Sequence, residues 1–244
     1  MKSNYRYIVK AFMAMAVIAG TTSCDDFLDR EPMSSISPET YYSTAAQLEA
    51  NLNDEYPNVL PSFGQWTYGI FGEDKGTDNQ IEVNANDRYT QDRWKVPHSE
   101  SDNWKFERIY RINFFLSEAL PKFGEDMSGS QNTISGSVAT IKHYIGEMYF
   151  LRAYEYFKKL QLFGDFPIIN QPLADEMEAL REASKRFPRN EVARFIISDL
   201  DKAYAYMSDV DMATTRINKD AAMLVKSRVA LFEATWLQNF KGTA

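Results

Sequence analysis

The most regular pattern of apolar and polar residues covers about residues 138–162, where apolar side chains occur on nearly every side of a helix. A surface helix carries one apolar stripe, whereas a helix that is apolar all round is buried. The pattern therefore predicts a long central helix. Gly146 and Ala153 within it leave room for another helix to approach closely, and Gly164 and Pro167 are expected to end it.

Shorter helical patterns precede this segment. Residues 37–39 (Ser-Pro-Glu) combine an N-cap, a proline at the first helical position and an acidic first turn. Thr44 and Gln47 have the spacing of a capping box, which marks a second helix start. Pro57 and Pro61 are expected to stop the helix that begins at Thr44.

Other helical stripes lie further along the chain. One begins at Trp104 and is expected to end near residues 121–124. Asn190 and Asn218 are the expected N-caps of two more helices, and the inner stripe of the last one ends on Trp236. Both tryptophans are predicted to be core residues. Helix pairs joined by short loops predict a mainly α fold, in which tetratricopeptide-like helix pairs form a solenoid-type scaffold.

The N-terminus has the three parts of a secretory signal. Lys2, Arg6 and Lys10 form a charged region, residues 11–19 are apolar, and small residues follow. This apolar run is too short for a membrane-spanning helix, which needs about 20 residues. Residues 1–23 are therefore predicted to be a lipoprotein signal peptide, with an uncleaved anchor as the alternative.

Cys24 is the one cysteine of the chain and follows the small residues directly. Its position predicts that it is the lipidated first residue of a mature lipoprotein, with residues 24–36 as a tether; a free core thiol is the alternative. Cleavage before Cys24 changes the formal net charge from −7 to −10, because the first 23 residues hold three basic and no acidic residues. A chain this acidic repels nucleic acid, so we expect no nucleic-acid partner.

Several stretches, in a fixed order, carry a likeness to a known family. The most specific runs from Glu147 to Leu160, EMYFLRAYEYFKKL, and is closed by FGDFP at 163–167. Two other stretches precede it: CDDFLD at 24–29, followed by Pro32, and Trp104 together with Tyr110, Ile112 and Asn113. Two more follow it: Pro188-Arg189 together with 197–200, and RINK at 216–219 together with 221–222 and 226–231. In these stretches the chain resembles the N-terminal half of the SusD/RagB family, nutrient-binding outer-membrane lipoproteins of Bacteroidetes.

The resemblance implies a helical scaffold of tetratricopeptide-like pairs whose irregular loops hold a shallow glycan site. It also implies a lipid-anchored protein on the cell surface, which delivers oligosaccharide to a TonB-dependent SusC-like transporter. Asp25 and Asp26 then resemble the acidic export signal of that phylum. Residues 37–244 correspond to the N-terminal part of the helical domain, and we expect the chain to be a fragment that lacks the C-terminal half.

Residues 62–103 lack helical periodicity, and a loop this long in a compact domain is usually functional. A sugar presents an apolar face to aromatic rings and a rim of hydroxyls to polar side chains. The segment supplies both kinds of residue. The alternative is that its aromatic side chains fill a small satellite core. The candidates for ligand contact are Trp66, Tyr68, Asp78, Asn79, Arg88 and Trp94.

No enzyme constellation stands out. The sequence has no GxSxG or phosphate-binding loop, and His98 and His143 do not have metal-ligand spacing. Glu147 and Arg152 lie in the most apolar helix, so we expect an internal ion pair or an anchored loop rather than catalysis. We therefore expect a binding protein without cofactor or metal, and assign no calcium site.

The ligand class stays open at this point. The alternatives to a glycan are a peptide, as for a RagB-type lipoprotein, and a module that contacts only other proteins. Aromatic platforms flanked by amides favour glycans, whereas an extended polar trough favours peptides.

Overall fold

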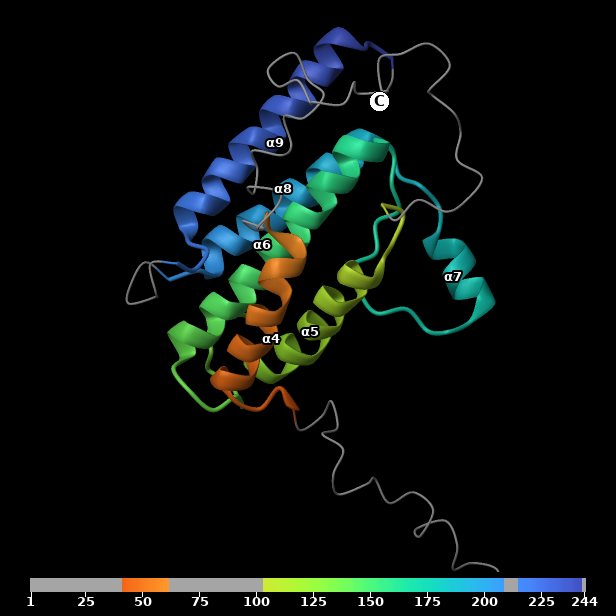
Figure 1. The fold of residues 1–244 in the computed structure, drawn as a ribbon. Helices are drawn as coiled ribbons and strands as arrows, with labels where there is room; N and C mark the ends of the chain where they lie inside the picture. Colours follow the sequence, from red (N-terminus) through yellow and green to blue (C-terminus); the bar gives the residue numbers. More distant parts are fainter. Residues whose placement is uncertain (1–40, 62–102, 209–214, 243–244) are drawn as a thin grey trace, which may run out of the picture. The chain divides into compact units, whose positions relative to one another are not determined.

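The computed structural model describes residues 41–61, 103–208 and 215–242, and this part of the chain is helical (Figure 1). Its helices belong to the unit Tyr42–Ala244. Pairing of β type is limited, within the described residues, to the isolated bridges Thr44–Ser135 and Phe166–Phe187. The helices are α4 (Ala45–Val59), α5 (Glu107–Phe123), α6 (Val138–Phe163), α7 (Met177–Ala183), α8 (Arg189–Tyr206) and α9 (Lys219–Asn239).

Helix α6 is the centre of the fold, as its apolar pattern predicts. Helices α4, α5 and α8 pack against it, and α9 packs mainly on α8 (Figure 1). A Cβ at Gly146 would lie 3.1 Å from the carbonyl oxygen of Ala203 and from Met207 Cγ, so the missing side chain lets α8 approach closely. The helix ends at Gly164, whose φ of 69° favours glycine.

The capping box before α4 is present, but Pro57 does not stop this helix. Thr44 Oγ1 accepts from the Gln47 N–H, and the Gln47 side chain accepts from the Thr44 N–H. The helix continues through Pro57 to Val59. A proline costs one backbone hydrogen bond, and so close to the C-terminus little helix remains to be disrupted. Pro121 is contained in the last turn of α5 in the same way.

Trp104 is not a helical core residue. It lies before α5 and is half-buried, with its ring edge-on to Phe163 at 4.8 Å and to Phe166 at 5.0 Å between centroids. The stripe predicted from the sequence therefore begins too early. The tryptophan packs instead against aromatic residues at and just after the end of α6.

The predicted caps of the last two helices have different outcomes. Asn218 caps α9, since its side chain accepts from the Ala221 N–H at 2.9 Å. Asn190 lies inside α8, which begins after Pro188 without a side-chain cap. Trp236 is half-buried beneath the Arg189 guanidinium, 3.8 Å from the ring centroid, and is not a buried core residue.

Helix α9 buries or half-buries its predicted stripe and leaves apolar side chains on its other sides exposed. Val229 is buried, whereas several large apolar side chains are exposed to solvent on this helix and its end. They are Met223, Leu224, Leu231, Leu237 and Phe240. Packing of α9 on α8 alone covers one side of the helix, so an apolar pattern on its other sides remains exposed.

Residues 1–40 lie outside the described part, so the signal peptide, the tether and the helix start at 37–39 stay predictions. None of the described helices is long and apolar enough to cross a bilayer.

Candidate functional site

The ligand candidates chosen from the sequence cannot be placed. All six lie within 62–102, outside the described residues: Trp66, Tyr68, Asp78, Asn79, Arg88 and Trp94. His98 lies in the same range, and Cys24, Asp25 and Asp26 lie within 1–40, which is also outside the described residues. The described residues that flank this segment are Pro61 and Asn103, and each lines a surface hollow. The site below is built from described residues alone.

A pocket of about 410 Å³ lies between α5, α6 and α8, and we call it the tyrosine pocket. Tyr149 of α6 and Tyr206 of α8 line it, with ring centroids 5.8 Å apart and planes inclined at 63°. Asn170 and Gln171 contribute exposed amides from the loop after α6. The remaining lining residues are Leu116, Ser117, Leu120, Pro121, Glu125, Met127, Arg152 and Lys202.

A buried ion pair fixes Arg152, one of the residues that line this pocket. Arg152 is 3% exposed, and its Nε and Nη2 donate to the two carboxylate oxygens of Asp199 at 2.6 and 2.8 Å. The planar guanidinium pairs bidentately with a carboxylate, which fixes the orientation of both groups. Its carbon lies 5.1 Å from the Tyr149 ring centroid, so the same pair positions the tyrosine.

The same arginine anchors the loop that carries the amides. Arg152 Nη1 donates to the carbonyl oxygen of Asn170 at 3.2 Å and to Asn113 Oδ1 at 2.9 Å. The Asn113 amide in turn donates to the Ile169 carbonyl oxygen, and the Tyr156 hydroxyl bonds both backbone groups of Ile169. The predicted structural role of Arg152, pairing and loop anchoring, is therefore confirmed.

The pocket offers hydrogen-bonding groups beside its charged lining residues Glu125, Arg152 and Lys202. Burial raises the pKa of Tyr149 to about 12, so its phenol keeps the proton at neutral pH and acts as a donor. Burial also raises the pKa of Tyr206. The half-buried Tyr206 ring offers apolar surface beside the buried Tyr149, and the amides of Asn170 and Gln171 both donate and accept. This combination suits a sugar ring and its hydroxyls.

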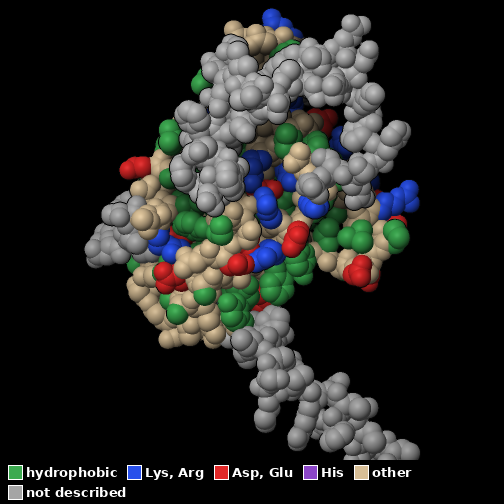
Figure 2. All heavy atoms as spheres, in the orientation of Figure 1, with side chains coloured by type: hydrophobic (Ala, Val, Ile, Leu, Met, Phe, Trp, Pro, Cys, Tyr) green, Lys and Arg blue, Asp and Glu red, His purple; other side chains and the backbone are tan. Residues whose placement is uncertain are grey.

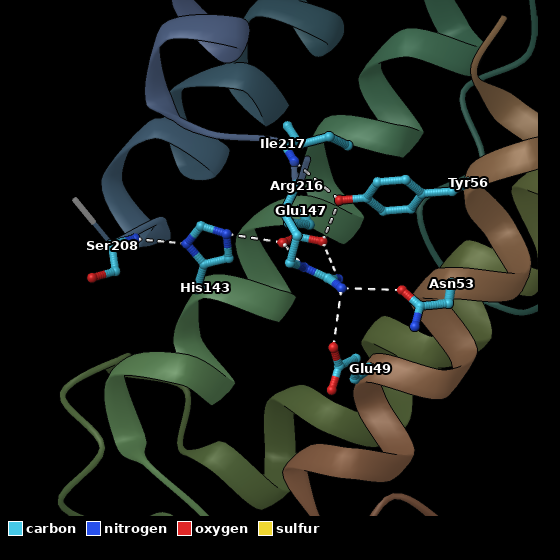
Figure 3. A network of polar contacts seen from close by, with 8 residues as sticks. All are labelled: Glu49, Asn53, Tyr56, His143, Glu147, Ser208, Arg216 and Ile217. Carbon is cyan, nitrogen blue, oxygen red and sulfur yellow. Dashed lines mark hydrogen bonds and ion pairs between the residues drawn. The ribbon is translucent and has the colours of Figure 1, made fainter. Parts of the chain in front are cut away.

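A second buried network joins α4, α6 and the residues before α9 (Figure 3). Its centre is the Glu147 carboxylate, which is fully buried. Arg216 approaches both of its oxygens, with Nε 2.8 Å from Oε1 and Nη2 2.6 Å from Oε2. The Tyr56 hydroxyl donates to Oε2 at 2.7 Å and accepts from the Ile217 N–H at 3.1 Å.

His143 completes this network as a neutral side chain. Its Nδ1 accepts from the Ser208 N–H at 2.9 Å, so the ring proton is on Nε2, which lies 2.8 Å from Glu147 Oε1 (Figure 3). Burial acts to raise the pKa of Glu147, but the hydrogen bonds from His143, Arg216 and Tyr56 outweigh it and lower the pKa. The network therefore holds the buried Glu147 carboxylate in place.

Sequence reasoning missed the tyrosine pocket. It predicted that the helix over about 138–162 is buried, and Tyr149 of this helix is indeed only 6% exposed, yet it lines a pocket. The signal that could have found the site is the polar pair Asn170–Gln171, which interrupts an otherwise apolar loop. Within the described residues, no group of three or more His, Cys, Asp and Glu side chains is placed to hold a metal ion.

The chain is similar to proteins of one known family. Residues 26–231 match the SusD-like family described as starch-binding and associating with the outer membrane. The SusD-like protein P25 of Formosa agariphila is 25% identical over 233 residues, covering 88% of this chain and 41% of the relative. The SusD-like protein P2 of the same organism is 26% identical over 238 residues, covering 93% and 43%. The chain thus spans less than half the length of these curated relatives.

Solved structures show the same fold. A SusD-like carbohydrate-binding protein of Bacteroides fragilis has a TM-score of 0.54 at 18% identity, covering 81% of this chain and 39% of its own. A SusD-like carbohydrate-binding protein of Bacteroides vulgatus has a TM-score of 0.53 at 18% identity, covering 80% and 43%. The fold is thus a mainly α scaffold of tetratricopeptide-like helix pairs, as predicted, and the match over residues 26–231 shows that the chain belongs to the SusD-like family.

Proposed function

We propose that this protein binds glycans at the cell surface and does not act as an enzyme. The observation that carries the proposal is the tyrosine pocket, where Tyr149 and Tyr206 stand beside the amides of Asn170 and Gln171 in a chain of the SusD-like family. Aromatic platforms with flanking amides are the arrangement expected for sugars, and they favour a glycan over a peptide. The candidates in 62–94 remain part of the proposal as further ligand contacts.

The proposed route of the ligand follows the family. Cys24 is proposed to carry the lipid that anchors the protein to the outer membrane, with Asp25 and Asp26 directing it to the cell surface. The partner is proposed to be a SusC-like TonB-dependent transporter, which receives the oligosaccharide. Mass spectrometry of wild type and Cys24→Ser tests the lipid, and protease treatment of intact cells tests the surface location. Copurification with the transporter tests the partner.

Binding is tested on the full chain in mild detergent, by affinity electrophoresis against starch, dextran and xylan. We expect Tyr206→Ala to weaken binding, because it removes one wall of the pocket. Tyr204→Ala is the matched control, since Tyr204 is on the same helix, 44% exposed, and is not among the pocket-lining residues. Equal binding by the two variants would exclude the tyrosine pocket as the site.

The sequence candidates are tested in the same assay. Trp66→Ala and Trp94→Ala are expected to weaken binding if 62–94 supplies ring contacts, because stacking on a sugar face depends on the indole. Wild-type protein that binds none of the polysaccharides, but binds peptides, would replace the glycan proposal with the peptide alternative.

A further inference from the structure

Two adjoining hollows lie where the end of α4, the start of α5 and the second half of α6 meet. One is about 370 Å³ and the other about 280 Å³, and Arg108 and Lys158 line both. We call them together the cationic cleft. In Figure 2, lysine and arginine side chains gather near the middle of the face, over the region between α6 and the first turns of α5.

The lining of this cleft has the opposite charge to the protein. Its basic residues are Lys105, Arg108, Lys158, Lys159 and Arg228, and its acidic residues are Glu107 and Glu155. The whole chain has a net charge of −7. A concave surface with a surplus of one sign concentrates ions of the other sign, so this cleft attracts anions even though the protein as a whole repels them.

Part of this charge is used inside the protein. Glu155 is 3% exposed and lies 2.6 Å from Lys158 Nζ and 3.3 Å from Lys159 Nζ. Lys159 is buried and also donates to the Asn103 carbonyl oxygen at 2.7 Å. The buried carboxylate therefore accounts for Lys159 and for part of the charge of Lys158, but not for the arginines.

The arginines are the cations available to a ligand. The Arg108 side chain is 48% exposed and reaches Glu155 only at 3.9 Å. Arg228 is exposed, and it makes no ion pair with any residue that the structure describes. Guanidinium groups suit carboxylate and sulfate groups because their N–H donors match two acceptor oxygens at once. Two exposed arginines in one hollow, of which Arg108 has only a long contact with Glu155, thus suit an anionic ligand.

The cleft also offers a surface for a sugar ring. Tyr154 lines the smaller hollow, stacked on Phe150 with centroids 6.2 Å apart, and Lys158 Nζ lies 5.8 Å from the Tyr154 ring centroid. Asn58 and Gln161 add amides on the exposed rim. An aromatic ring, cations and amides that line one hollow suit a sugar that bears an acidic substituent.

We propose that the cationic cleft binds an acidic glycan, with the anionic substituent held by Arg108, Lys158 and Arg228 and the sugar ring against Tyr154. The proposal rests on the proposed glycan-binding function and narrows it to sugars that carry a carboxylate or a sulfate. The cleft is a separate surface from the tyrosine pocket, because the two share no lining residue.

The test uses the full chain in mild detergent and three polymers with one backbone: dextran, carboxymethyl dextran and dextran sulfate. Calorimetry should give at least one charged polymer a Kd roughly tenfold or more below that of dextran, with affinity falling as salt rises. The polymer that binds identifies carboxylate or sulfate as the preferred group. Arg108→Gln/Arg228→Gln should lose about tenfold in affinity for it.

The matched control is Arg194→Gln/Lys241→Gln, which removes the same charge from exposed positions outside the cleft. Its Kd should stay within about twofold of the wild-type value. An equal loss of affinity in both double variants would show diffuse electrostatic attraction and refute the cleft as the binding site. Wild type that binds dextran as tightly as either charged polymer overturns the acidic class but leaves the proposed function standing. Wild type that binds no polysaccharide overturns both.

Discussion

Replacing Glu147 by glutamine tests whether the buried network holds the helical domain together. Glutamine has nearly the same shape, but its amide NH₂ must face some of the donors that now point at the carboxylate. Those donors are Arg216, with two N–H groups, the Tyr56 hydroxyl and the His143 ring (Figure 3). The change therefore removes the buried partner of a largely buried arginine and leaves it the half-exposed Glu49.

The size of the effect follows from the burial of the two partners. The Arg216 side chain is 9% exposed and that of Glu147 is fully buried. Breaking such a pair by removing one partner costs roughly 3–5 kcal/mol in the free energy of unfolding. Glu49, 43% exposed and 3.3 Å from Arg216, recovers no more than the ~0–1 kcal/mol of an exposed pair. We expect a net loss of about 3 kcal/mol, or about 6–12 °C in Tm for a chain of this size.

Thermal and urea unfolding followed by circular dichroism measure this loss. Glu182→Gln is the control, because Glu182 pairs with Lys185 where both side chains are more than half exposed, and its loss costs roughly 0–1 kcal/mol. If the two variants unfold at the same temperature, the network does not stabilise the fold and our reasoning is wrong.

The same comparison depends on pH in a defined direction. The pKa of Glu147 is lower in the folded protein than its ordinary value, so its carboxylate contributes fully to stability above the ordinary glutamate range. That contribution is lost as the pH falls through the folded pKa. The difference in unfolding free energy between wild type and Glu147→Gln should therefore be constant near neutrality and shrink in acid. A difference that grows in acid would contradict the direction of the shift.

Three further substitutions test other parts of the fold. Tyr56→Phe removes the partner of the Ile217 N–H and should cost about 1–3 kcal/mol in urea unfolding, whereas a neutral result would mean that water replaces the hydroxyl. Gly146→Ala places a Cβ 3.1 Å from Ala203 and should cost about 1–3 kcal/mol by overpacking; an unchanged Tm would show that α8 can move away. Asn218→Ala removes the α9 cap and should lower the free energy of unfolding by about 1 kcal/mol. The same substitution of an exposed asparagine outside the helices is the control and should change the same unfolding curves by about zero.

Local signals gave the reliable predictions. The extent of α6, its end at Gly164 and the caps at Thr44 and Asn218 depend on residues within a few positions of one another, so the sequence shows them directly. The helix end predicted at Pro57 and the helix start predicted at Asn190 were wrong, because the ends of a helix also depend on what its first and last turns pack against. Helix α7 has seven residues and buries none of them, so its sequence gives only a short periodic signal.

Tertiary structure alone decided the polar partners. Glu147 and Arg152, five positions apart on one helix, pair with Arg216 and Asp199, which are 69 and 47 residues away. The sequence indicated that these charges must be compensated, because a buried unpaired charge is costly, but not by which residue. The family, the central helix and the need for pairing could thus be predicted. The tyrosine pocket and the cationic cleft could not, because they form only where helices distant in sequence meet.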